Sequence, residues 1–195
     1  MIDLDDATAI SSRAPCKLPS IHGISRVRSS PCSWALLGNP ERANEAVRAA
    51  NTESPLDTLI NLAEAPEVRA VVDMSRNKPE EAVRELEPVR PYDLCVALNL
   101  ASGYYRGLAY LRSGLPKHAV AEFQAVLSQR GAAPHSLYIP LSELQLVKLL
   151  SQAGDSDVAL GLAKELEEIW RAADGDFPPL RELLTVTTKI HRGLK

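Results

Sequence analysis

Aromatic residues are scarce in this chain, at 5% of its 195 positions, whereas hydrophobic residues make up 45% and charged residues 24%. A chain of this length can bury a sizeable core as one domain, but with few large rings it must do so through many small aliphatic contacts. Helices rich in Ala and Leu suit that kind of core. The composition also excludes collagen and coiled-coil classes. We therefore expect a modest helical domain.

Neither an excess of positive charge nor a long apolar run is present. The formal net charge is -3, without the basic footprint that nucleic-acid binding usually requires. The first ten residues, MIDLDDATAI, open with acids and predict neither a signal peptide nor a membrane anchor. We expect a cytoplasmic protein that binds neither nucleic acid nor membrane.

Cysteines are few and unevenly placed. Cys16 and Cys32 lack the CxxC spacing of zinc sites, and Cys95 falls on a predicted helix as a small apolar residue. An odd number of cysteines in such contexts indicates a reducing cytosol. A metal site formed by Cys16, His22 and Cys32 would have only three ligands at unusual spacing, so we expect no structural metal and no cofactor.

Catalytic motifs are absent from the sequence. There is no GxSxG elbow, HExxH zinc helix, Walker loop or protein-kinase motif set. His118 stands at the start of a predicted helix and His135 in a loop, where packing or surface roles are common. The adjacent acids Glu80 and Glu81 point about 100° apart on a helix and do not form a catalytic pair. We expect that the protein is not an enzyme.

Two regions differ in their periodicity. Residues 1–29 contain prolines and serines without a period of 2 or 3.6, which predicts a flexible arm. Residues 30–195 alternate helical patterns with turn signals and form the predicted domain. Within it, residues 102–134 indicate a helix, a tight turn at Gly114, and a second helix that begins near Pro116.

This central stretch resembles the tetratricopeptide (TPR) repeat. Small residues, Gly107 and Ala119, stand where two antiparallel helices cross closely, and large ones, Tyr110 and Phe123, stand beside the crossing. The turn residues of successive units, Gly38, Asn77, Gly114 and Gly154, follow at intervals of 39, 37 and 40 residues. Arg106 departs from the pattern, which usually has Leu.

The resemblance assigns structural roles at every unit. It predicts an all-α fold, a right-handed TPR-like superhelix of antiparallel helix pairs, with a C-terminal capping helix after Pro178 and Pro179. The first pair has a shortened leading helix, and Pro66 is expected to restart the helix of the second. The predicted structural positions are Gly38, Ala43, Ala82, Gly107, Tyr110, Gly114, Ala119, Phe123, Gly154, Ala159 and Trp170.

A narrower resemblance extends over about four fifths of the chain. The phrases SPLDTL (54–59), YYRGLAYLRSG (104–114) and IWRAADGDFPPL (169–180) are similar to the TPR tail of acidobacterial eukaryotic-type serine/threonine kinases and of winged-helix regulators. Val147 and Ala163 depart from it, since that family usually has Gly and an aromatic residue there. The resemblance implies a role in signalling without phosphoryl transfer, because the kinase motifs are missing.

A groove for a protein or peptide partner is the function that the repeat implies. The first helix of each pair lines the concave face, which places eight residues there: Val71, Met74, Tyr104, Leu108, Arg112, Leu144, Lys148 and Gln152. An apolar floor beside two cations suits a segment that carries a carboxylate. An equally open alternative is that Tyr104 and Leu108 pack against the neighbouring repeat and do not line the groove. The alternative function is structural, a self-associating homodimer without a separate ligand.

Overall fold

The computed structural model describes residues 39–95 and 98–193. All regular secondary structure within these residues is helical. The predicted arm (1–29), the shortened leading helix and Gly38 lie outside these residues. No strand occurs within the described ranges, which confirms the all-α class. The elements are α2 (Pro40–Glu53), the π-helix η3 (Ile60–Glu64), α3 (Ala65–Ser75), α4 (Pro79–Leu86), the 3₁₀ helix η4 (Glu87–Tyr92), α5 (Ala101–Arg112), α6 (Pro116–Ser128), α7 (Tyr138–Ala153), α8 (Ser156–Ile169) and α9 (Pro178–Gly193).

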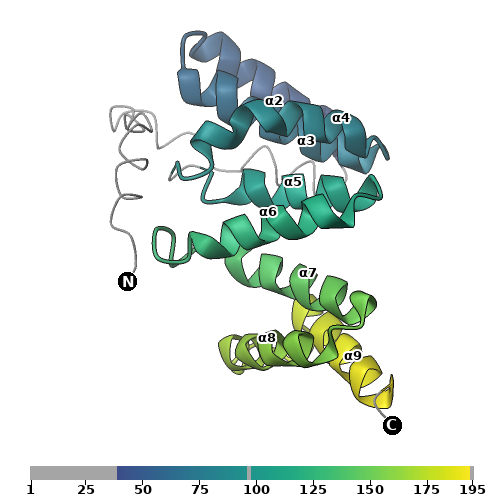
Figure 1. Ribbon diagram of the computed structural model, residues 1–195. Coiled ribbons are helices and arrows are strands. Elements are labelled where there is room, and N and C mark those ends of the chain that lie inside the picture. The colour runs from purple at the N-terminus through teal and green to yellow at the C-terminus, as the bar shows by residue number, and fades with distance from the viewer. Residues whose placement is uncertain (1–38, 96–97, 194–195) are drawn as a thin grey trace, which may run out of the picture.

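One turn geometry recurs at three helix junctions. Asn77, Gly114 and Gly154 have positive φ values of 58°, 73° and 90°, so the chain leaves each helix through the left-handed region. The amide after each of them donates to a carbonyl five residues back, from Lys78 to Asp73 (2.9 Å), from Leu115 to Tyr110 (2.9 Å) and from Asp155 to Leu150 (3.0 Å). These turns join α3 to α4, α5 to α6 and α7 to α8 as antiparallel pairs. Figure 1 shows the pairs stacked in layers from α2 to α9.

The second pair begins earlier than the sequence analysis predicts. Pro66 does not restart a helix; helical structure is continuous from residue 58 to residue 75. Asp57 caps its start, with Oδ1 accepting from the amides of Leu59 (2.9 Å) and Ile60 (3.1 Å). Proline cannot donate to the carbonyl four residues back. The chain accommodates it with the wider π-turn of η3, in which the Ala65 amide donates to Ile60, five residues earlier.

Small residues occupy the tightest helix crossings. Ala43, Ala82, Ala119 and Ala159 have no exposed surface, and each belongs to one of the apolar clusters between helices. A side chain at Gly107 would place its Cβ only 2.5 Å from Cε1 of Phe123. That glycine is therefore what allows α5 to approach the large ring on α6.

In the next pair, α7 and α8, the equivalent positions carry the larger residue on the first helix and the smaller one on the second. Val147 and Ala163 stand at the same offsets from Gly154 as Gly107 and Phe123 do from Gly114. Both are buried, at 0% and 1% exposure, in the cluster between α7, α8 and α9. A larger residue on the first helix thus accompanies a smaller one on the second, and this departure from the family pattern leaves the pair closely packed.

Cys95 differs from its prediction. It lies between η4 and α5, outside any helix, and is disulfide-bonded. Both observations correct the expectation of a reduced cysteine on a helix face.

Among the described residues, no helix combines the length and the apolar character that a membrane span requires.

Candidate functional site

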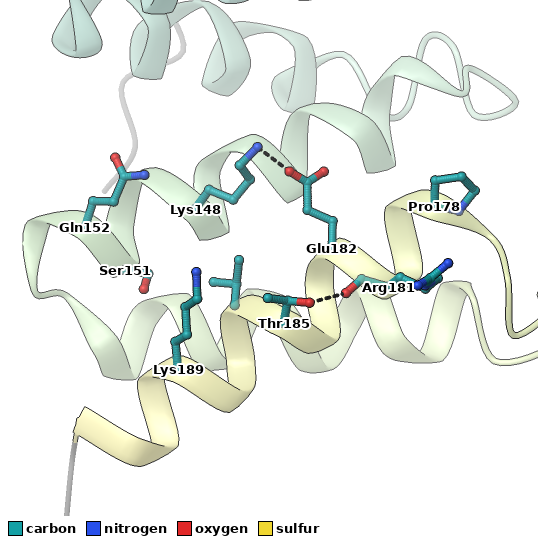
Figure 2. Close-up of a pocket in the computed structure, with 9 residues that line it drawn as sticks. Lys148, Ser151, Gln152, Pro178, Arg181, Glu182, Thr185 and Lys189 are labelled. Atoms are coloured by element: carbon teal, nitrogen blue, oxygen red, sulfur yellow. Dashed lines mark hydrogen bonds and ion pairs between the residues drawn. The ribbon is translucent and has the colours of Figure 1, made fainter.

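A cleft of about 560 Å³ lies between α7 and α9. Figure 2 shows side chains from both helices along its length, with Gln152 and Lys148 on α7 opposite Lys189 and Glu182 on α9. Most of the residues that line it carry a polar or charged group, and the lining comprises Lys148, Ser151, Gln152, Pro178, Arg181, Glu182, Thr185, Val186 and Lys189.

An apolar seam holds the two helices together beneath this cleft. Leu144 and Val147 of α7 pack in one cluster with Leu183 and Ile190 of α9, and all four are at most 5% exposed. Helix α9 is amphipathic, so the opposite stripe, which includes Arg181, remains polar. The seam fixes α9 on α7 and therefore positions the lining residues on rigid helices.

Trp170 secures the approach to α9. It is buried, and its ring meets Phe177 edge to face, with centroids 5.6 Å apart. Phe177 also packs against the cluster that contains Leu166 and Leu183. This contact ties the connection between α8 and α9 to the core, so the orientation of α9 is set from both of its neighbours.

Positive charge exceeds negative charge along the cleft. Lys148 Nζ lies 2.6 Å from Glu182 Oε1, across the cleft from α7 to α9. Arg181 and Lys189 have no ion pair within the described part of the chain. Three cations therefore accompany one carboxylate, and the single ion pair is exposed enough to contribute little to stability.

Tyr104 lies on α5, close enough to Glu182 for the carboxylate charge to act on its hydroxyl group. Burial raises the pKa of its hydroxyl to about 12, and the charge of Glu182 adds to that rise. The ring packs against Tyr138 and Phe123, with centroids 5.4 Å and 6.0 Å away. Tyr104 is therefore a neutral, largely packed residue beside the cleft.

The structure places the eight predicted groove residues in different environments. Val71, Met74 and Leu144 are buried in the core, and Tyr104 and Leu108 pack against the clusters between neighbouring pairs. Arg112 is exposed, but its Nη1 donates to the carbonyl of Met74 (3.2 Å) and so links α5 to α3. Lys148 and Gln152 line the cleft.

The residues contributed by α9 were missed in the sequence analysis. Arg181, Thr185 and Lys189 follow one another at intervals of four, which places them on one stripe of the helix. That spacing was a visible signal. The repeat pattern predicts α9 only as a capping helix, with no part in the binding surface.

A second charged cluster lies inside the fold. Arg106 is 1% exposed and pairs with Asp93 (2.6 Å) and Glu122 (2.9 Å), and its Nη1 donates to the carbonyl of Leu86 (3.1 Å). Arg90 also reaches Glu122. These contacts tie η4, α5 and α6 together, which explains a buried Arg where the repeat pattern has Leu.

Glu87 extends this cluster to the surface. Its carboxylate accepts hydrogen bonds from Arg90 Nε (2.7 Å) and from the Tyr110 hydroxyl (2.7 Å). The bond from Arg90 is the main reason why the pKa of Glu87 falls to about 2. The cluster has a structural role because its charges are engaged with one another.

Glu143 is a buried carboxyl group on α7. Its Oε2 pairs with Arg130 (2.9 Å), whereas Oε1 has no hydrogen-bond partner among the described residues. Burial raises its pKa above the usual range, and the charge of Glu165 adds to the rise. It does not line the cleft between α7 and α9.

Within residues 39–95 and 98–193, no three side chains gather in a way that could hold a metal ion. The cleft instead offers ammonium, guanidinium, hydroxyl and amide donors on two rigid helices. Such groups bind and orient an anionic or polar chain by charge-assisted hydrogen bonds.

No protein-family model matches the chain, and neither a curated protein nor a solved structure matches it.

Proposed function

We propose that this chain is a non-catalytic scaffold that binds a segment of a partner protein in the cleft between α7 and α9. The observation that carries the proposal is the cleft itself, about 560 Å³ in volume and lined by polar side chains on helices that the seam below holds rigid. Clefts of that size accommodate several residues of an extended or helical segment.

The arrangement of helix pairs as a right-handed TPR-like superhelix is part of the same proposal. Its support is the recurring turn at Asn77, Gly114 and Gly154 and the fully buried alanines at equivalent positions. In a TPR array the first helices of successive pairs form the binding face, and α7 is such a helix. The similarity to kinase and regulator tails suggests signalling as the context.

An unbiased peptide library tests the proposal. The chain would be prepared with a photoreactive residue in place of Gln152, which lines the cleft, and separately in place of Lys164, which is exposed on α8 outside it. Peptides selected from a random library should crosslink at position 152 and not at position 164. Failure to select any peptide, or equal crosslinking at both positions, would contradict the proposal.

Self-association is the competing function, and the same preparation addresses it. Light scattering over a concentration series should give the mass of one chain throughout if the cleft serves a partner. A dimer combined with no selected peptide would favour the structural role instead.

A further inference from the structure

The cleft presents two rows of polar side chains, one from each helix. Lys148 and Gln152 stand four residues apart on α7, and Arg181, Thr185 and Lys189 do so on α9. Residues at this spacing share one face of a helix. A chain lying between the helices would therefore meet the donors of Lys148 and Gln152 on one side and those of Arg181 and Lys189 on the other. The Thr185 hydroxyl already donates to the carbonyl of Arg181 (2.8 Å) and can only accept.

The charge of the lining indicates which chain fits. Glu182 is the one carboxylate among the nine lining residues, and Lys148 already pairs with it at 2.6 Å. Arg181 and Lys189 form no ion pair in the described part of the chain. The cleft thus has an uncompensated charge of two cations, although the whole protein is acidic, with a net charge of -3.

We propose that the cleft takes an acidic peptide segment, and that Glu182 occupies the place of one of its carboxylates until the segment binds. This inference rests on the proposed function and specifies its ligand. The partner's carboxylate would pair with Lys148 in exchange for Glu182, and further acidic side chains would meet Arg181 and Lys189. Both members of the existing pair are partly exposed, at 27% and 45%, so water can replace their contact.

The lining favours a peptide over a single-stranded nucleic acid. None of the described residues that line the cleft is aromatic, whereas proteins that hold unpaired bases stack them on aromatic side chains. Pro178 and Val186 instead provide apolar surface on which the aliphatic parts of peptide side chains can pack. An acidic peptide uses both the cations and these apolar surfaces.

Because the peptide would take the place of Glu182, removal of this carboxylate should strengthen peptide binding. The Glu182→Gln variant removes the internal competitor, so it should bind a fluorescein-labelled hexaglutamate probe roughly three- to tenfold more tightly by fluorescence anisotropy. Glu168→Gln is the matched control. Glu168 is also an exposed carboxylate in an ion pair, with Arg171 at 3.4 Å, but it does not line the cleft, so its loss should leave the affinity unchanged.

Loss of a cation should act in the opposite direction. Lys189→Gln should weaken hexaglutamate binding by roughly three- to tenfold, whereas Lys164→Gln, on the outer surface of α8, should not. Raising the salt concentration should weaken binding to the parent protein. Circular dichroism on each variant would verify that it is folded.

Three results would overturn the inference. The first is a hexaglutamine probe that binds as tightly as hexaglutamate, and the second is a Glu182→Gln variant no tighter than Glu168→Gln. The third is a single-stranded oligonucleotide that binds more tightly than hexaglutamate and competes for the cleft. If library peptides crosslink at position 152 but are neutral in composition, the acidic ligand is wrong and the proposed function stands.

Discussion

The exchange of residue sizes between successive helix pairs explains how the pattern varies without loss of packing. Gly107 faces Phe123 so closely that a Cβ at position 107 would overlap the ring, whereas the equivalent positions hold Val147 and Ala163. In the pair formed by α3 and α4, the equivalent positions hold Ala70 and Leu86, both fully buried. The combined volume of the two positions is constrained more strongly than either residue.

A double-mutant cycle should measure this constraint. Phe123→Ala should cost about 3–5 kcal/mol because it leaves a cavity, and Gly107→Val should cost about 1–3 kcal/mol because the added atoms meet the ring. Combining them reproduces the composition found at positions 147 and 163, so the double variant should be more stable than the sum of the single effects predicts, by about 1–3 kcal/mol. Urea denaturation gives these values; simple additivity would contradict the size exchange.

Glu87 makes stability depend on pH in acid. Its folded pKa is about 2, below the ordinary value of 4.5, so it contributes stability above pH 4.5 that is lost as the pH falls toward 2. Because its side chain is 41% exposed, we expect this contribution to stay below about 1 kcal/mol. Melting temperatures should fall over this range in the parent and fall less in Glu87→Gln. An equal fall in both proteins would show that the bonds from Arg90 and Tyr110 contribute nothing.

At the scale of elements, the sequence predicted the helix boundaries best where the chain needs a special residue. Gly114 and Gly154 mark left-handed turns because glycine adopts them at least cost, and Asn77 takes the same role at φ 58°. The join between η3 and α3 could not be predicted in this way. A proline ordinarily begins or breaks a helix, and only the packing around Pro66 selects the wider π-turn.

The candidate site was predicted in part for a related reason. Lys148 and Gln152 follow from the position of α7 as the first helix of a pair. The periodicity of α9 identifies its apolar stripe but does not say which neighbour that stripe will contact. Its docking on α7 buries Leu144, which the sequence assigns to an open groove, and brings Lys189 to the cleft instead.

Adjacent leucines on α9 provide a test of this docking. Leu183 is fully buried against α7 and α8, whereas Leu184 is 47% exposed. We expect Leu183→Ala to cost about 2–5 kcal/mol and Leu184→Ala to change stability by less than about 0.5 kcal/mol. The two variants remove the same atoms from the same helix, so denaturation midpoints that coincide would show that α9 does not pack as described.

The helices of residues 39–95 and 98–193 form a linear stack, in which each helix packs mainly against the helices next to it. Helices α2 and α9 lie at opposite ends of that stack (Figure 1). The apolar clusters follow the same order, since the one that contains Ala82 and Leu86 shares no buried member with the one that contains Ala163 and Leu183. Stability in such an array is set locally, by each unit and its interfaces.

Hydrogen exchange should therefore show where a destabilising change acts. Leu86→Ala in α4 and Leu183→Ala in α9 remove equal side chains from fully buried positions in the two halves of the stack. We expect the first to reduce amide protection mainly in α3 and α4, and the second mainly in α7, α8 and α9, because opening need not spread through the intervening helices. Mass spectrometry of peptide fragments resolves these segments. If either variant lowers protection equally across all of the described helices, the molecule opens as one cooperative unit, and its contacts across the stack are stronger than the linear packing implies.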